Sequence, residues 1–200
     1  MRIAAIVLAA GASRRLGQPK QLVRAGDETL LERTLRVARE AGLREVFAVL
    51  GAHAERILKE ADLGISIAVE NAAWETGMAS SIHAGLRAAL EQTPDLEAVM
   101  LLVCDQPRLT AAHLVRLIDA AQEGEVVASA YGGVPGVPAV FPASAFARLM
   151  ELQGDAGARR LLQDRSVLTV AFEEGVIDVD TEEDLRRIMD DRWFRDPSQG

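Results

Sequence analysis

Short apolar runs of strand type alternate with helical patterns along most of this chain, and this alternation constrains the fold more than any other feature. The apolar runs are Ile3–Leu8, Glu45–Leu50, Ile65–Val69, Val99–Cys104 and Val126–Ala130, with shorter ones at Ala139–Phe141 and Val167–Phe172. Strands that alternate with helices predict βαβ units and a mostly parallel sheet. The run at 99–104 is apolar on both faces, which is typical of a central parallel strand. After about Gly124 the pattern loosens, so we expect the C-terminal third to mix helices and strands less regularly.

Three helices can be placed from apolar spacing and from capping residues. Residues 31, 35 and 38 are apolar and share one helix face. Residues 114, 117, 118 and 121 repeat at helical spacing, and Thr110 before them is the expected N-cap. Thr181 and Asp184 resemble a capping box at the start of a third helix.

Composition limits the class of protein and its partners. We expect 200 residues to form one domain over residues 1–191, followed by a flexible tail at 192–200. The net charge of −8 argues against nucleic acid or an anionic membrane as a partner. Cys104 is the single cysteine, which excludes an intramolecular disulfide and suits a reducing cytoplasm. The sequence has neither a signal-peptide pattern nor a run long enough to cross a membrane, so we expect a cytoplasmic protein.

A glycine-containing loop with several cations follows the first apolar run. It reads Gly11, five residues, Gly17, two residues, Lys20, which fits neither the Walker spacing nor the Rossmann spacing. Pro19 favours extended backbone at Gln18, so we expect Lys20 to lie on extended chain beyond a long loop. Such a loop could wrap a triphosphate with its backbone N–H groups, using Arg15 and Lys20 as charge clamps. The alternative is a tight turn with solvated arginines.

Acidic residues follow two of the expected strands. Asp105 comes directly after the apolar run at 99–104, and ligands of parallel sheets bind beyond the carboxyl ends of the strands. Asp105 should therefore face the same crevice as the first loop, where a carboxylate suits Mg²⁺ that bridges phosphates. Asp178 and Asp180 share one face of an extended segment, and one of them could complete the metal site. The alternatives are a turn aspartate and solvated acids near a helix N-terminus.

Three further segments carry candidate binding residues. The segment 71–81 leads into a helix that extends to about Leu90, whose first N–H groups could hold a phosphate or ribose oxygen; the alternative is an ordinary serine cap. The segment 136–141 is typical of a Pro/Gly turn before a strand, and the segment 154–159 of a loop before a helix; Arg159 could bind an anionic group of a second substrate. The three histidines lack metal-ligand spacing, and we expect Cys104 to be buried and inert.

Five motifs in order resemble the MobA-like family of small nucleotidyltransferases that act on the molybdenum cofactor. The first motif is L-A-A-G-x-S-x-R-M-G-x-x-K, and the chain departs from it only at Leu16. The others are G-M-x-S-S at 77–81, D-Q-P at 105–107, G-D-x-G-A-R at 154–159 and D-x-D-T at 178–181. The resemblance covers residue 2 to about residue 191 and is strongest to the cytidylyltransferase branch. It implies a three-layer α/β/α, Rossmann-like domain of the nucleotide-diphospho-sugar-transferase type, with a mixed, mostly parallel sheet.

The resemblance also implies roles for individual residues. It places Arg15, Lys20 and Asp105 in catalysis. Nucleotide binding would involve Leu8, Ala9, Ala10, Gly11, Arg15, Lys20, Ser80 and Ser81. The second substrate would meet Pro138, Asp155 and Arg159, and Mg²⁺ would be held by Asp105 with Asp180 or Asp178.

The implied reaction joins a nucleotide to molybdopterin. A phosphate oxygen of molybdopterin would attack the α-phosphorus of a nucleoside triphosphate, and pyrophosphate would leave. The guanylyl branch tends to have glycine where this chain has Ala10, whose methyl group would crowd a purine, so we expect CTP. The family often has histidine at the position of Val137, which leaves open a sugar or polyol phosphate as the acceptor. A third hypothesis is a non-catalytic protein that delivers the cofactor to a molybdoenzyme client.

Overall fold

A mixed sheet of seven strands forms the centre of the molecule. The computed structural model describes residues 1–121, 124–163, 166–176, 178, 179, 181, 183, 184, 186 and 187. The strand order is β5-β4-β1-β6-β8-β7-β9. The strands are β1 (Ile3–Ala9), β4 (Glu45–Leu50), β5 (Ile67–Glu70), β6 (Ala98–Val103), β7 (Val127–Tyr131), β8 (Val134–Pro142) and β9 (Leu168–Ala171). A separate two-stranded ribbon joins β2 (Arg24–Ala25) to β3 (Glu28–Thr29).

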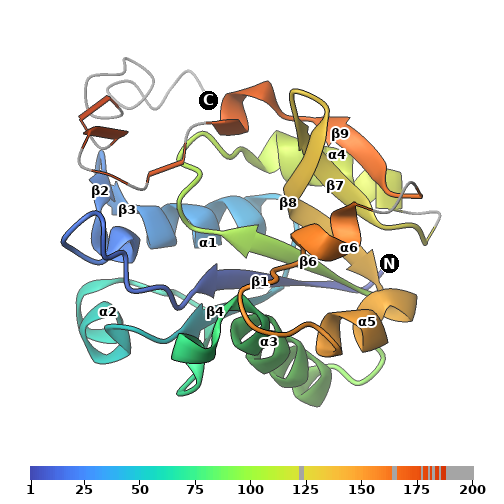
Figure 1. Cartoon of the computed structure of the whole chain (residues 1–200), viewed down its shortest axis with the longest axis horizontal. Helices are drawn as coiled ribbons and strands as arrows, with labels where there is room; N and C mark the ends of the chain where they lie inside the picture. The colour runs from blue at the N-terminus through green and yellow to red at the C-terminus, as the bar shows by residue number, and fades with distance from the viewer. Residues whose placement is uncertain are drawn as a thin grey trace.

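Helices cover both faces of this sheet. They are α1 (Leu30–Glu40), α2 (Ala54–Glu60), α3 (Met78–Gln92), α4 (Ala111–Ala120), α5 (Phe146–Met150) and α6 (Arg159–Leu162). Figure 1 shows α1 and α4 on one side of the sheet and α3 and α5 on the other. Each side has its own apolar core, with Leu35 and Leu114 in one and Ile82 and Leu149 in the other. The expected three-layer α/β/α architecture is confirmed.

The strand predictions agree closely with the structure. All seven apolar runs are strands, and β4 has the bounds that the sequence predicts. The pairs β1–β4, β1–β6, β4–β5 and β7–β9 are parallel. β8 is the exception, because it runs antiparallel to both β6 and β7. The sheet is therefore mixed but mostly parallel, and its irregular part lies in the C-terminal third, as expected.

Helix caps are confirmed at two sites and corrected at a third. The Thr110 side chain accepts a hydrogen bond from the His113 N–H at the start of α4. The Thr181 N–H donates to Asp184 Oδ2 over 2.9 Å, and the Asp184 N–H donates back to Thr181 Oγ1. The alternative of a serine cap for α3 is wrong, because Gly77 is its N-cap and makes no side-chain capping bond.

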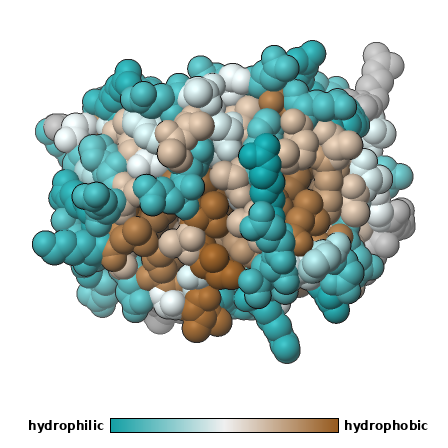
Figure 2. Space-filling model, turned by 90° about the horizontal axis from the view of Figure 1, so that it is seen from below, coloured by the Kyte–Doolittle hydropathy of each residue, from teal (hydrophilic) through white to brown (hydrophobic). Residues whose placement is uncertain are grey.

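The face on the side of α3 and α5 exposes some apolar surface. Figure 2 shows hydrophobic areas there, separated by a band of hydrophilic side chains. Met78 at the start of α3 is 46% exposed. Apolar atoms are common on protein surfaces, so this pattern does not identify a partner. Among the described residues, no helix is both long and apolar enough to cross a membrane.

The expected flexible tail, residues 192–200, lies outside the described residues, so the domain boundary at residue 191 stays a prediction. Cys104 is buried as predicted, and burial raises the pKa of its thiol to about 12. A thiol with that pKa carries almost no thiolate near neutral pH, which agrees with an inert residue.

Candidate active site

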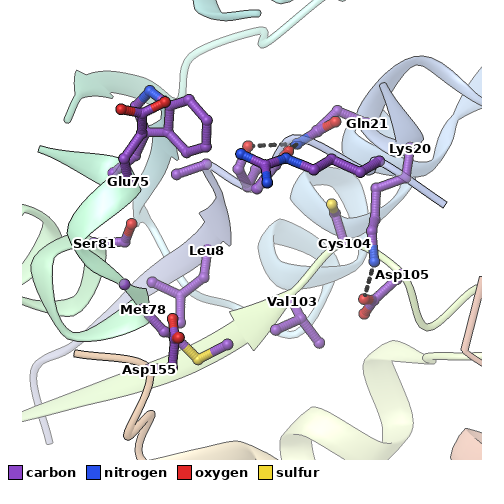
Figure 3. A pocket seen from close by; sticks show the side chains of 16 residues that line it. Leu8, Lys20, Gln21, Glu75, Met78, Ser81, Val103, Cys104, Asp105 and Asp155 are labelled. Carbon is purple, nitrogen blue, oxygen red and sulfur yellow. Dashed lines mark hydrogen bonds and ion pairs between the residues drawn. The ribbon is translucent and has the colours of Figure 1, made fainter. Parts of the chain in front are cut away.

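A cavity of about 360 Å³ lies at the carboxyl ends of β1 and β6. The two strands are neighbours, with Leu8 paired to Val103, so the loops that follow them leave the sheet side by side. Figure 3 shows the side chains that line the cavity. They are Leu8, Ala9, Ala10, Gly11, Arg14, Lys20, Gln21, Trp74, Glu75, Gly77, Met78, Ser81, Val103, Cys104, Asp105 and Asp155. The first loop and Asp105 therefore share one crevice, as the sequence predicts.

The first loop is held in a defined shape by short-range contacts. Ser13 adopts a positive φ of 51°, and its carbonyl accepts a hydrogen bond from the Leu16 N–H over 3.0 Å. Leu16 is buried in a small cluster with Val23 and Leu30, which anchors the loop to the start of α1. In the described part of the chain, the Gly11 N–H donates to no other group. The loop can therefore offer a backbone donor to an anion.

Lys20 lies at the end of this loop, but its backbone conformation differs from the prediction. It begins a short 3₁₀ helix, Lys20–Leu22, and does not lie on extended chain. Pro19 remains extended, and the turn is completed when the Leu22 N–H donates to the Pro19 carbonyl. The Lys20 N–H donates to Ser13 Oγ over 3.0 Å. The 3₁₀ turn thus closes the loop and directs the lysine side chain toward β6.

Lys20 and Asp105 form an ion pair across the cavity. Lys20 Nζ lies 2.7 Å from Asp105 Oδ2, and the two side chains are only 17% and 20% exposed. Figure 3 shows this contact between the residue that closes the first loop and the residue that follows β6. The cation and the carboxylate are thus close enough to act on the same bound group. A half-buried pair of this kind is screened by solvent less than a surface pair.

The segment with the second pair of acids lies beside Asp105. The Val179 N–H donates to the Asp105 carbonyl over 2.9 Å, and Val179 packs against Leu16. Burial raises the pKa of Tyr131 to about 12, and the charges of Asp178 and Asp105 both add to this shift. Asp178 is exposed but does not line the cavity. Asp180, the preferred second metal ligand, lies outside the described residues.

These carboxylates fit a magnesium ion that is shared with a substrate. The described residues contain no group of three or more metal-binding side chains. Mg²⁺ commonly binds one or two carboxylates and takes its other ligands from phosphates and water. Asp105 lines the cavity, and the charges of Asp105 and Asp178 both act on Tyr131, so these two carboxylates are the described candidates for such a set. The site thus suits an ion that arrives with phosphates better than one held by protein alone.

The start of α3 forms the opposite wall and brings Asp155 to the cavity. Gly77 has a φ of 113°, and a Cβ there would lie 2.3 Å from the carbonyl carbon of Gly154. The Ala79 N–H donates to the Gly154 carbonyl over 3.1 Å. Two motifs that are far apart in the sequence are therefore in direct backbone contact, and Asp155 lines the cavity between them.

Asn71 organises the two predicted serines. Its Nδ2 donates to Ser80 Oγ over 2.8 Å and to Ser81 Oγ over 3.0 Å. Ser81 lines the cavity, whereas Ser80 turns back to donate to the Gly77 carbonyl. Ser80 therefore stabilises the start of α3, and Ser81 is the serine placed to meet a ligand.

Some predicted residues lie away from the cavity. Arg15 is exposed and is absent from the lining, which contains Arg14. Pro138 is buried in β8, where its carbonyl accepts a hydrogen bond from Ser129 Oγ. Arg159 is exposed at the start of α6. Their predicted roles stay predictions, and for Pro138 and Arg159 they require a second substrate that extends beyond this cavity.

Other lining residues were not predicted from the sequence. Trp74 packs on Gly51, where a Cβ would lie 2.5 Å from Trp74 Cβ and 2.9 Å from Ala10 Cβ. Gln21 is fully buried and contacts the first loop. Trp74 lies shortly after the carboxyl end of β5, and this position was the available signal for it, whereas Gln21 has no such signal.

Comparison with known proteins identifies the family. The model of the MobA-like NTP transferase domain matches residues 5–170. This chain belongs to that family. It is 32% identical to nicotine blue oxidoreductase of Paenarthrobacter nicotinovorans, over 94% of this chain and 96% of the relative. It is 30% identical to a probable molybdenum cofactor guanylyltransferase of Opitutus terrae, over 86% of this chain and 85% of the relative.

Solved structures of similar proteins have the same fold. The Rv0371c homologue from Mycobacterium sp. strain JC1 has a TM-score of 0.82 at 34% identity, covering 94% of this chain and 95% of that one. Rv0371c from Mycobacterium tuberculosis, crystallised with manganese, has a TM-score of 0.75 at 33% identity, covering 94% and 98%. That crystal structure is a complex with a divalent metal ion. A nucleotidyl transferase of Methanothermobacter at 22% identity shares the fold, with a TM-score of 0.80 and coverage of 96% and 98%.

Proposed function

We propose that this protein is a Mg²⁺-dependent cytidylyltransferase of the cytoplasm that transfers CMP from CTP to molybdopterin. The observation that carries the proposal is the placement of Lys20 and Asp105, 2.7 Å apart, beside the loop that follows β1. In the reaction, an oxygen of the molybdopterin phosphate attacks the α-phosphorus of CTP. The bond from that phosphorus to the bridging oxygen breaks, and pyrophosphate leaves. Alignment and charge neutralisation account for most catalysis of this kind, so no protein nucleophile is needed.

The residues of the cavity take distinct roles in this proposal. Lys20 neutralises the triphosphate, helped by Arg14 from the cavity wall and by Arg15. Asp105 would hold Mg²⁺ together with Asp178 or Asp180. When bound, the ion neutralises phosphate charge and aligns the phosphates for attack. The N–H groups of the loop and Ser81 orient the nucleotide.

The preference for CTP rests on Ala10. This residue lines the cavity, and its methyl group lies where Gly51 and Trp74 already pack closely. A purine base needs more room along this backbone than a pyrimidine does. The Ala10 methyl group therefore favours the smaller base, although the relative from Opitutus terrae is named as a guanylyltransferase.

The acceptor is the less constrained part of the proposal. The name of that same relative supports molybdopterin, whereas the relative from Paenarthrobacter nicotinovorans is named as an oxidoreductase. Asp155 lines the cavity, and Arg159, which begins α6 a few residues later, suits an anionic group of the second substrate. Val137 occupies the position where the family often has histidine, so a sugar or polyol phosphate is the second candidate.

Pyrophosphate release tests the proposal directly. The protein is incubated with Mg²⁺ and each of the four nucleoside triphosphates, with and without molybdopterin, and pyrophosphate is measured. We expect release that requires both CTP and molybdopterin. Release only with a sugar or polyol phosphate would change the acceptor, and release with another nucleotide would change the base. Tight molybdopterin binding without pyrophosphate, and cofactor delivery unaffected by Lys20→Ala, would instead support a delivery protein.

A further inference from the structure

We propose that Gln21 is a positioning residue that sets the shape of the nucleotide-binding loop through two backbone carbonyls. The inference rests on the proposed function, because it concerns how the same cavity holds a nucleoside triphosphate. Gln21 does not belong to the motifs that carry the family resemblance. Its role follows from its contacts.

One nitrogen of Gln21 holds two points of the loop. Gln21 Nε2 donates to the Ala9 carbonyl over 2.6 Å and to the Gly11 carbonyl over 3.0 Å. The residue is 0% exposed, and its contact with the loop is visible in Figure 3. These two carbonyls flank Ala10, the residue on which the proposed base preference depends. Gln21 therefore fixes the backbone on both sides of that position.

The orientation of these carbonyls decides where the loop amides point. In a trans peptide the C=O and the following N–H point in opposite directions. The Ala9 and Gly11 carbonyls face Gln21, so the N–H groups of Ala10 and Ala12 point away from it. In the described part of the chain, the Ala12 N–H donates to no other group. Gln21 thus fixes the direction of this donor, which lies one residue after Gly11 of the cavity lining.

A primary amide is well suited to this task. Its nitrogen carries two hydrogens and can donate to two acceptors at once. Glutamate and methionine are similar in length but offer no donor, and asparagine is one methylene shorter. Gln21 Oε1 is buried and has no hydrogen-bond partner among the described residues. An unpaired buried oxygen is unfavourable, so stability alone is a poor explanation for a glutamine here.

Gln21 also connects the loop to Lys20. The two residues are consecutive in the same 3₁₀ turn, and the Lys20 side chain reaches Asp105 while Gln21 reaches the loop. If the amide is lost, the turn loses its tie to Ala9 and Gly11. The N–H donors of the loop would then sample several orientations. The affinity for the nucleotide would fall more than the rate of the chemical step.

The test compares Gln21→Met with wild-type protein by calorimetric titration of CTP in the presence of Mg²⁺. Gln106→Met is the matched control, because Gln106 is also buried, donates from Nε2 to Tyr131 and Val137, and has an unpartnered Oε1. We expect Gln21→Met to raise the Kd for CTP at least fivefold and Gln106→Met to change it less than twofold. In the transfer assay, the KM for CTP should rise with Gln21→Met while the KM for the acceptor stays within twofold of wild type.

A change below fivefold for Gln21→Met, or an equal loss in both variants, would overturn the inference. If Gln21→Met does not fold, Gln21→Asn decides, since it keeps a polar amide but cannot reach both carbonyls; wild-type affinity in that variant would also overturn it. Wild-type protein that binds none of the four nucleotides would overturn the proposed function itself, which is a separate and distinguishable result.

Discussion

The Lys20–Asp105 ion pair joins two groups that the proposed reaction needs on different partners. Lys20 is proposed to bind triphosphate, and Asp105 is proposed to bind the metal, so the pair must open when both arrive. In Lys20→Met, a metal ion no longer has to displace the lysine from Asp105, and the lost ion pair is worth roughly 1 kcal/mol. We expect Mn²⁺ to bind this variant about fivefold more tightly without nucleotide, and CTP to bind it more than tenfold more weakly. Electron paramagnetic resonance of Mn²⁺ and calorimetry measure the two effects.

The control for this prediction is Lys59→Met, because Lys59 is the chain's other lysine and is exposed on α2. It should change neither affinity. If Lys20→Met weakens binding of both Mn²⁺ and CTP, the ion pair assists metal binding and does not compete with it.

Asp105 should be needed for turnover but not for folding. Its side chain faces the cavity, whereas its carbonyl holds Val179 through the backbone and would do so in any variant. We expect Asp105→Asn to lower kcat/KM by about 10²–10³-fold, comparable to the loss of one electrostatic group in other active sites. Circular dichroism should stay unchanged, and Asp119→Asn, at an exposed site on α4, should keep full activity. Loss of the folded state would mean that Asp105 is structural.

Ala10 should control the choice of base. Removing its methyl group widens the cavity beside Gly51 and Trp74. We expect Ala10→Gly to raise the ratio of kcat/KM for GTP to that for CTP by about tenfold, since one methyl group in a pocket typically changes discrimination by 1–3 kcal/mol. Competition assays with both nucleotides measure this ratio. An unchanged ratio would show that the base is selected elsewhere in the cavity.

Single residues also mark the limit of sequence-based prediction. Lys20 and Asp105 could be predicted because each lies at the end of a recognisable strand or loop, and the fold brings such ends together. The cavity lining contains Arg14 and not Arg15, and the reason lies in an irregular backbone with a positive φ at Ser13. Spacing does not reveal the side-chain directions in such a loop. Gln21 was missed because its importance depends on which carbonyls lie above it.

The N-terminus of α3 depends on close backbone contact with the loop at residue 154. Gly77 has a φ of 113°, and a Cβ there would lie 2.3 Å from Gly154. We expect Gly77→Ala to lower the free energy of unfolding by about 3 kcal/mol, from strain and from the steric clash together. Urea denaturation measures the change.

Gly42→Ala is the matched control because Gly42 has a φ of 90° but open space around a Cβ. It should cost only about 1 kcal/mol, since it carries the strain without the clash. Equal losses in the two variants would show that the contact with residue 154 adds nothing to stability.

Whole elements were easier to predict than their ends and directions. The strands follow from β-branched and apolar runs, and burial of both faces in β1 and β6 follows from the same residues. The antiparallel direction of β8 was not predicted, although the two glycines that connect Tyr131 to Val134 are typical of a β-hairpin. The pairing of β8 with β6 depends on a strand that is distant in the sequence. Lys20 was predicted to lie on extended chain, but it begins a 3₁₀ turn. Proline restricts its own backbone and that of the residue before it, so Pro19 does not determine the conformation of Lys20.

At the scale of the molecule, the sheet unites residues that the sequence separates widely. The loops after β1 and β6 meet because those strands pair, and the Asp178 segment joins them through the Val179–Asp105 hydrogen bond. The site is therefore a product of strand order. Pro138 in β8 and Arg159 in α6, the residues predicted to meet the second substrate, lie outside the cavity. The strand order therefore determines the nucleotide cavity more directly than it determines which acceptor binds beside it.

The folded state should lose stability in alkaline solution through one buried and one half-buried group near this site. Burial raises the pKa of Cys104 from 9.0 to about 12 and that of Tyr131 from 10.0 to about 12. A raised pKa means that the folded protein binds the proton more tightly than the unfolded chain does. The contribution of these two protonated groups to the free energy of unfolding is complete below pH 9 and is lost as the pH rises toward 12. We expect the free energy of unfolding to fall by roughly 4 kcal/mol between pH 8 and pH 11.

Urea denaturation at a series of pH values measures this loss, and Cys104→Ala separates the two groups. The variant is less stable at pH 8 because a buried side chain is shortened, but its alkaline loss should shrink to about a third, the share of Tyr131. A loss of the same size in Cys104→Ala would assign the alkaline transition to groups other than the thiol beside Asp105.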